Sequence, residues 1–130
     1  MAVSASRPFE GLTVVAIDQA VAAPFASSRL ADGGARVIKI ERPEGDFARG
    51  YDDVVAGGQA SYFVWLNRGK ESLVVDIASP EGKAELAALL ATADVLIQNL
   101  KPGALDRLGF GPAKLRETHP RLIVASISGY

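Results

Sequence analysis

The sequence alternates short apolar runs with stretches of helical character, and this alternation constrains the fold more than any other feature. The apolar runs are rich in Val, Ile and Leu and occupy residues 12–17, 36–41, 72–77, 94–98 and 121–127. Strands that alternate with helices form βαβ units, whose parallel sheets are buried on both faces and whose strands are therefore apolar throughout. The sequence thus predicts an α/β fold, with an open, mainly parallel, Rossmann-like sheet and helices on both faces.

Helices are expected between these runs, at residues 22–30, 61–67, 79–90, 102–108 and 112–117. The first helix is expected to stop at Asp32-Gly33-Gly34, and the third begins with the favourable cap Ser79 followed by Pro80. Residues 43–58 are rich in Gly, Pro and Asp and are expected to form a long loop. Such a loop in a compact domain is more often functional than structural.

Length and composition limit the class of protein. The chain has 130 residues, the size of one compact domain, and we divide it into a lead of residues 1–11 and one domain of residues 12–130. No apolar run approaches the roughly 20 residues that span a bilayer, and the start lacks a secretory signal. A cytoplasmic protein without membrane contact is therefore expected. The net charge of −1 argues against nucleic-acid binding by the whole chain.

Several residue types are set aside as site candidates. The absence of cysteine excludes thiolate catalysis and zinc–cysteine sites. Asp52 and Asp53 have no nearby His, so no metal site is expected. Trp65, with Tyr62 and Phe63, is expected to pack in the core rather than to serve as a platform for a base.

Candidate binding residues follow from the predicted topology, because ligands of open parallel sheets sit outside the carboxyl ends of the strands. We take this edge to comprise residues 18–24, 42–50, 67–70, 99–107 and 128–130. The cations in these segments are Arg42, Arg49, Arg68, Lys70, Lys101 and Arg107. Arginine suits bidentate phosphate contacts, and Lys70 would act as a point charge. Any one of these cations fits an ordinary solvated surface, but their placement at successive strand ends predicts a phosphate site.

Two common phosphate-binding motifs are missing. A dinucleotide-binding fold needs G-x-G-x-x-G at the first turn from strand to helix, but the turn from Asp18 to Pro24 contains no glycine. Gly33 and Gly34 come after the helix, where they stop it. A Walker A loop is also absent, so the sequence gives no support for nucleoside triphosphate chemistry.

Several motifs together resemble those of one enzyme family. Residues 30–43, LADGGARVIKIERP, resemble the L-x-x-x-G-A-x-V-I-K-[IV]-E-x-P stretch of the class III CoA-transferases, also called the CaiB/BaiF family. Residues 61–70 resemble its Y-F-x-x-x-N-x-x-K motif, and residues 99–109 resemble its N-F-x-P-G-x-x-x-[KR]-x-G motif. Residues 120–130 resemble its N-P-R-[LI]-[IV]-x-x-S-[IV]-x-G-[FY] motif. Each motif is loose alone, but several in the right order are fairly specific.

The resemblance implies that the chain binds coenzyme A, or an acyl-CoA, as a substrate and holds no tightly bound cofactor. The residues carried over as CoA contacts are Ala22, Arg42, Asn67, Arg68, Gly69, Lys70, Asn99, Leu100, Lys101 and Arg107. No residue of this chain is carried over as catalytic. Val21 stands where the formyl-CoA transferase branch often has Gln, which argues against a preference for formyl-CoA or oxalate.

The resemblance also implies a reaction for the complete protein. The family transfers CoA between an acyl-CoA and a small carboxylic acid through an aspartate, which forms an anhydride and then a thioester. That aspartate is expected downstream of Tyr130, so this segment is expected to be incomplete and inactive by itself. The rest of the enzyme, or the second subunit of an interlocked homodimer, is the expected partner.

Two alternatives stay open at this point. The first is an acyl-CoA racemase of the same superfamily, which uses a base and an acid in place of the covalent carboxylate. The second is a non-catalytic module that binds CoA or a nucleotide. Residues 67–70 and 105–107 favour the transferase modestly, and the sequence beyond Tyr130 would discriminate between the three.

Overall fold

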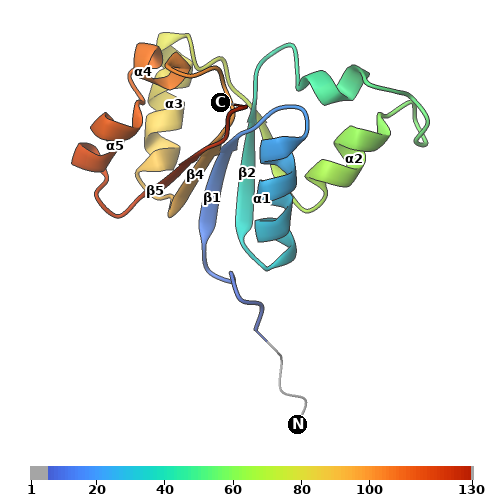
Figure 1. The fold of residues 1–130 in the computed structure, drawn as a ribbon, viewed down its shortest axis with the longest axis horizontal. Coiled ribbons are helices and arrows are strands. Elements are labelled where there is room, and N and C mark those ends of the chain that lie inside the picture. Colours follow the sequence, from blue (N-terminus) through green and yellow to red (C-terminus); the bar gives the residue numbers. More distant parts are fainter. Residues whose placement is uncertain (1–5, 130) are drawn as a thin grey trace.

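A computed structural model describes residues 6–129 and contains one five-stranded sheet (Figure 1). The strands are β1 (Thr13–Ile17), β2 (Arg36–Glu41), β3 (Glu71–Val74), β4 (Val95–Gln98) and β5 (Ile123–Ser126). They lie in the order β3-β2-β1-β4-β5, and every neighbouring pair is parallel. The prediction of an open parallel sheet in an α/β fold is therefore confirmed.

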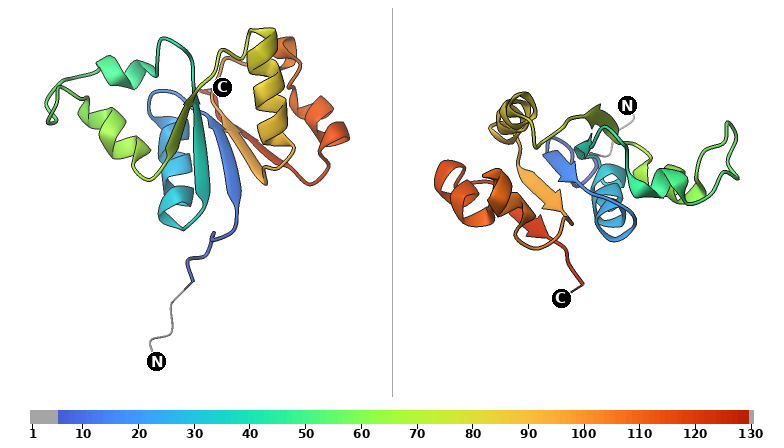
Figure 2. Two further views of the ribbon diagram at one scale, coloured as in Figure 1. Left: turned by 180° about the vertical axis from the view of Figure 1, so that it is seen from behind. Right: turned by 90° about the horizontal axis from the view of Figure 1, so that it is seen from above.

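Helices cover both faces of this sheet. They are α1 (Ala22–Asp32), α2 (Ser61–Asn67), α3 (Pro80–Leu90), α4 (Ala104–Leu108) and α5 (Pro112–Thr118), with a short 3₁₀ helix η1 at Phe47–Gly50. Helices α1 and α2 lie on one side, while α3, α4 and α5 lie on the other (Figures 1 and 2). This arrangement follows from right-handed crossovers, because the chain reverses its direction across the sheet after β3. None of the helices in residues 6–129 has the length and apolar character needed to cross a membrane.

Alternate residues of the strands build two apolar clusters. Val15 and Ile17 of β1 pack with Leu86 and Leu90 of α3. Val14 and Ala16 point to the opposite face, where Ala23, Leu30 and Ala31 of α1 cover them. The period of two along a strand explains this division.

Part of the predicted lead packs on the folded domain. Phe9 contacts the cluster beneath α1, and its N–H donates to the carbonyl oxygen of Gly33 at 2.8 Å. Residues 1–5 lie outside the described part of the chain. The division at residue 12 stays a prediction.

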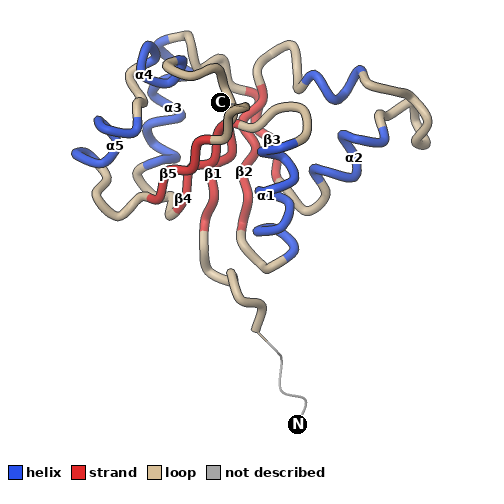
Figure 3. The backbone as a smooth tube through the Cα atoms, in the orientation of Figure 1, coloured by secondary structure: helices blue, strands red, loops and turns tan. Residues whose placement is uncertain are grey.

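The strands at the sheet edges are shorter than predicted, as the tube drawing shows (Figure 3). β3 begins at Glu71 and ends at Val74, whereas the sequence suggested residues 72–77. β5 is confined to Ile123–Ser126, inside the predicted 121–127. An edge strand pairs with one neighbour only, so its hydrogen bonds stop where that neighbour ends. The apolar composition of the edge strand does not show where this happens.

The prediction that Trp65 packs in the core is wrong. Its side chain is 52% exposed, and Tyr62 is 45% exposed. Trp65 contacts Phe25 of α1 and Tyr62 of its own helix, with ring centroids 6.2 and 6.3 Å apart. Helix α2 lies beside α1 and away from the sheet, so Leu66 is its one fully buried large side chain among the described residues.

Candidate functional site

Two neighbouring cavities lie at the carboxyl edge of the sheet. The first, which we call the apolar cavity, has a volume of about 200 Å³ and lies at the ends of β1, β2 and β3. Its walls include Ile17, Gln19, Ile40, Arg42, Val75, Ile77 and Leu100. The exposed wall surface is mostly apolar, although Asp18, Glu41, Asp46 and Asp76 also line it. The cavity therefore suits a flat or apolar group that carries a few polar atoms.

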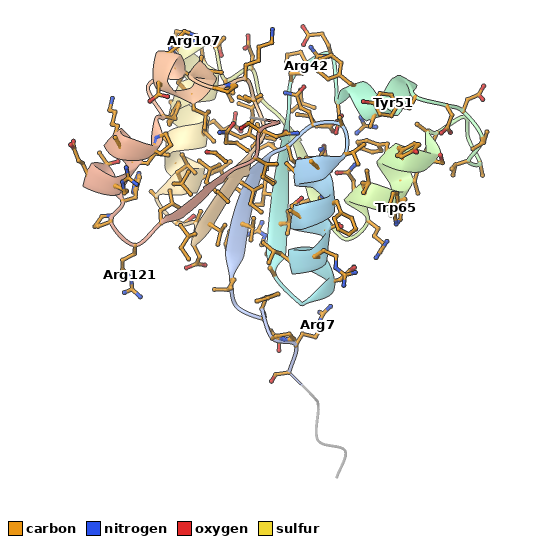
Figure 4. The ribbon with its side chains drawn as sticks, in the orientation of Figure 1. Arg7, Arg42, Tyr51, Trp65, Arg107 and Arg121 are labelled. Atoms are coloured by element: carbon orange, nitrogen blue, oxygen red, sulfur yellow. The ribbon has the colours of Figure 1, made fainter. Side chains whose placement is uncertain are left out.

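The second cavity, which we call the cationic cavity, has a volume of about 450 Å³ and is more open. Its walls include Gln19, Ala20, Arg42, Phe47, Asn99, Leu100, Lys101, Ala104 and Arg107. Arg42 and Arg107 lie at the same edge of the molecule, whereas Arg121 lies at the opposite edge (Figure 4). The predicted convergence of Arg42, Lys101 and Arg107 is therefore seen in the structure.

Arg42 is held in place by the loop that it begins. Its Nε donates to the carbonyl oxygen of Gly45 at 2.8 Å, and its guanidinium carbon lies 4.0 Å from the centroid of the Phe47 ring. Stacking and one hydrogen bond orient the guanidinium plane. The guanidinium is exposed, so its remaining N–H groups can contact an anion.

Asn99 connects the ends of β4 and β1. Its Oδ1 accepts a hydrogen bond from the backbone N–H of Gln19, and its Nδ2 donates to the carbonyl oxygen of Gln19, each at 2.8 Å. These two bonds fix the turn that follows β1. The side chain of Asn99 therefore has a structural task here, and the predicted contact with CoA would have to use its remaining donor and acceptor positions.

Ala20 has a strained backbone in this turn. Its φ is 63°, in the left-handed region that costs a residue with a Cβ roughly 1–2 kcal/mol. Its N–H donates to Asp46 Oδ1 at 2.9 Å. Asp46 is buried and caps η1 by accepting from the N–H of Ala48 at 3.0 Å. The loop after β2 therefore stabilises the unusual turn after β1.

A buried ion cluster lies directly beneath this turn. Lys39 Nζ lies 2.7 Å from Asp18 Oδ1 and 2.8 Å from Asp46 Oδ2, and all three side chains are almost fully buried. Lys70 Nζ donates to Asp18 Oδ2 at 3.1 Å. Burial alone would raise the pKa of Asp18, but the ammonium groups of Lys39 and Lys70 outweigh this effect and lower it.

Lys70 also bonds outside the ion cluster. Its Nζ donates to Asn67 Oδ1 at 2.9 Å and to the carbonyl oxygen of Pro24 at 3.0 Å. Burial lowers the pKa of Lys70 to about 8, and the negative charge of Asp18 offsets part of the effect. With only 1% of its side chain exposed, Lys70 supports the fold near the start of α1.

Glu41, the last residue of β2, anchors the loop that follows this strand. It accepts hydrogen bonds from Arg49 Nη2 at 2.7 Å and from Ser72 Oγ at 2.6 Å. The bond with Arg49, aided by Ser72, outweighs burial and lowers the pKa of Glu41 to about 2. Arg49, which the sequence placed among the phosphate-binding cations, is therefore engaged by a carboxylate.

The segment Asn67–Lys70 does not join the cavities. It precedes β3, and the first residue of that strand pairs with Ile38 in the middle of β2. Arg68 forms an exposed ion pair with Asp32 at 2.7 Å, and Gly69 makes the turn with a φ of 77°. The backbone of this segment does not lie at the carboxyl edge, because β3 starts directly after it. The side chain of Lys70 does reach that edge, where it contacts Asp18. Contacts between these residues and CoA stay a prediction.

The remaining carried-over residues lie at the edge. Ala22 is exposed at the first position of α1, and Leu100 lines both cavities. Lys101 is exposed on the cationic cavity.

Sequence reasoning missed the segment 75–78, which follows β3 and lines the apolar cavity. Ligands of a parallel sheet lie at the carboxyl ends of its strands, and residues 75–78 hold this position once β3 is known to end at Val74. The segment ends at Ser79, which caps α3. Gly82 of α3 allows the segment 75–78 to lie close to this helix, because a Cβ at Gly82 would overlap the carbonyl oxygen of Asp76. Gln19 and Phe47 were also missed as specific wall residues, although both fall in selected segments.

Comparison with known proteins identifies the family. The model of CoA-transferase family III matches residues 9–130. The chain belongs to CoA-transferase family III. It is 44% identical over 124 residues to the acetyl-CoA:oxalate CoA-transferase of Acetobacter aceti, covering 95% of this chain and 32% of that protein. It is 38% identical to the human succinyl-CoA:glutarate CoA-transferase, covering 95% of this chain and 28% of the human protein.

A solved structure of the family has the same fold. The CAIB/BAIF family protein from Brucella suis superposes with a TM-score of 0.90 at 40% identity, covering 97% of this chain and 34% of that one. This family III chain therefore spans about a third of the length of the relatives that it matches. The match lies in their amino-terminal portion.

Proposed function

We propose that this chain forms the coenzyme-A-binding part of an enzyme that transfers CoA between an acyl-CoA and a carboxylic acid. The observation that supports this most directly is the pair of adjoining cavities at the carboxyl edge. One is lined by aliphatic side chains and the other by Arg42, Lys101 and Arg107. CoA combines an adenine with phosphates and an extended pantetheine arm, so its chemistry matches such a pair.

The proposed mode of binding assigns a separate task to each cavity. Guanidinium and ammonium groups of the cationic cavity would contact the phosphates, with bidentate contacts from the two arginines. The aliphatic walls of the apolar cavity, including segment 75–78, would enclose the adenine.

The chemical step is proposed to use an aspartate outside this chain. Such a carboxylate would attack the acyl-CoA to form a mixed anhydride and release the CoA thiolate. The thiolate would then attack the aspartyl carbonyl, which releases the first acid as a carboxylate and leaves CoA on the enzyme as a thioester, and this is ordinary covalent catalysis. The names of the relatives, which are transferases acting on oxalate or glutarate, support a carboxylic acid as the second substrate. A homodimer of the complete protein is part of the same proposal.

The experiment is a calorimetric titration of the full-length protein with CoA and with dephospho-CoA at low and high salt. Phosphate contacts at an exposed site weaken as salt screens the charges, and loss of one phosphate weakens them further. We expect tighter binding of CoA than of dephospho-CoA, with a difference that shrinks at high salt. Equal affinities that do not depend on salt would refute the proposed phosphate site.

Arg107→Ala sharpens the test, with Arg121→Ala as the matched control. A hydrogen bond to a charged group contributes roughly 1.5–3 kcal/mol, so Arg107→Ala should weaken CoA binding about 10- to 100-fold. Arg121 is also exposed but lies at the opposite edge of the molecule (Figure 4), so its replacement should leave the affinity unchanged. Equal effects of both variants would point to general charge attraction.

A further inference from the structure

Gln19 stands out in the site because its side-chain amide has no partner. No hydrogen bond of this amide is found within residues 6–129, and Oε1 is buried without a donor. A buried acceptor that loses its hydrogen bond to water destabilises a protein by roughly the desolvation cost of the group. Native structures rarely retain such a group unless a ligand or water uses it.

The position of Gln19 connects this unpaired amide with a ligand. Gln19 is one of three residues that line both cavities, together with Arg42 and Leu100. Its backbone is fixed by the two hydrogen bonds with Asn99, so only the side chain is free to adjust. The terminal torsion of glutamine has a broad energy profile, so the amide can adjust its orientation to a bound group.

A second glutamine provides the contrast. Gln98 ends β4 and pairs in register with Ile17, so it lies within two residues of the level of Gln19 at the same edge of the sheet. Its Nε2 donates to Ser126 Oγ and its Oε1 accepts from the N–H of Leu100, each at 2.9 Å. The fold therefore satisfies the amide of Gln98 completely and leaves that of Gln19 unsatisfied.

We infer that Gln19 is a recognition residue, whose amide forms a paired donor and acceptor contact with bound CoA at the junction of the two cavities. This inference rests on the proposed function. A primary amide offers one donor face and one acceptor side by side, and it matches a group with the complementary pair. CoA contains one such group, the amino edge of adenine, which glutamine contacts in a bidentate manner elsewhere. The amides of the pantetheine arm point their N–H and C=O in opposite directions, so each could make only a single hydrogen bond with this amide.

If Gln19 serves to recognise the ligand and does not stabilise the fold, its replacement should not lower the unfolding temperature of the free protein. Gln19→Met keeps the length of the side chain and removes an unsatisfied polar group, so the free protein should unfold at the same or a higher temperature. Gln98→Met removes a satisfied amide and leaves the N–H of Leu100 without its acceptor, so it should lower the unfolding temperature. A structural role for Gln19 would give both variants the same sign.

The experiment measures thermal unfolding and ligand affinity of the full-length protein and of Gln19→Met. The probes are CoA, adenosine 3′,5′-bisphosphate, which lacks the arm, and 4′-phosphopantetheine, which lacks the nucleotide. Two neutral hydrogen bonds predict that CoA binds Gln19→Met about 5- to 150-fold more weakly. A matching loss with the bisphosphate assigns the contact to adenine, and a matching loss with phosphopantetheine assigns it to the arm.

Two outcomes overturn the inference while leaving the proposed function intact. One is that wild type binds CoA and Gln19→Met binds it equally well. The other is a fall in the unfolding temperature of Gln19→Met comparable to that of Gln98→Met. If wild type fails to bind CoA, the proposed function itself is refuted. Gln19→Ala repeats the affinity measurement with a smaller side chain, in case the methionine is accommodated poorly.

Discussion

Helices α3, α4 and α5 cover one face of the sheet with large apolar side chains, whereas the face beneath α1 combines small apolar residues with buried charges. The first face includes Leu86 and Leu90, both almost completely buried. The second contains Lys39, equally buried, in contact with two carboxylates. The two faces therefore have different roles. The face beneath α3, α4 and α5 stabilises the fold, whereas the face beneath α1 fixes the turn on which the candidate site depends.

The buried charges are costly by themselves, which is why their placement is informative. Desolvation of an ion pair in a protein interior often cancels its attraction, so apolar residues of the same size would stabilise the fold as well or better. Here the charges connect three segments that are distant in sequence: the turn at Asp18, the cap at Asp46 and the turn before β3. These buried charges fix the relative positions of the three segments at the carboxyl edge.

The largest expected effect comes from Lys39→Met. It leaves Asp46 buried without its cation and Asp18 with Lys70 alone, so we expect the free energy of unfolding to fall by about 3–5 kcal/mol. CoA affinity should fall too, because the turn at Ala20 loses its support. Urea unfolding and calorimetry measure the two effects.

The control is Arg36→Met, which breaks an exposed pair with Glu71 at 2.6 Å. Exposed pairs contribute little, so no measurable change in the urea midpoint is expected. A midpoint for Lys39→Met that matches wild type would contradict the assigned role of the buried charges.

The next effect in size concerns the apolar face. Leu86→Ala creates a cavity beneath α3, and we expect the free energy of unfolding to fall by about 2–5 kcal/mol. The affinity of the folded protein for CoA should stay unchanged, because the carboxyl edge keeps its geometry. Leu86→Met, which conserves volume, should cost less than about 1.5 kcal/mol. If Leu86→Ala weakened CoA binding as much as Lys39→Met does, the two faces would not differ in function.

The effect that is smallest near neutral pH is a pH dependence that belongs to the charged face alone. The pKa of Lys70 falls from 10.5 to about 8 on folding. Between these values the unfolded chain holds the proton and the folded chain has released it, so stability from this group rises with pH from about 8 to 10.5. Unfolding in urea at several pH values should show this rise in wild type and a flatter profile in Lys70→Met. The matched control is Lys101→Met, an exposed lysine whose replacement should leave the slope unchanged.

The fold was largely accessible from the sequence because its signals are local. The apolar runs, the stop at Gly33-Gly34 and the cap at Ser79 each act within a few residues and correctly placed most helices and strands. The site was accessible in part, because strand ends in a parallel sheet meet at one edge. Arg42, Lys101 and Arg107 were found by this rule.

Two of the errors arose where tertiary contacts decide, and one did not. Residues 67–70 were included in the carboxyl edge although they precede the third strand in the prediction as well as in the structure, so the rule for strand ends was applied there to a segment at the amino end. The burial of Lys39 in the middle of a strand could not be predicted, because its two carboxylate partners come from other segments. Trp65 was misplaced because a short helix at the side of α1 leaves most of its surface open.

The wall that the two cavities share has a further consequence. Gln19, Arg42 and Leu100 face both spaces, so the distance between the spaces is fixed by rigid strand ends. A molecule that fills both loses its freedom of overall motion once, whereas two separate fragments lose it twice. The whole ligand is then retained far better than its halves, provided that its own length matches. With CoA bound as proposed, the edge of the sheet would select ligands by length as well as by charge.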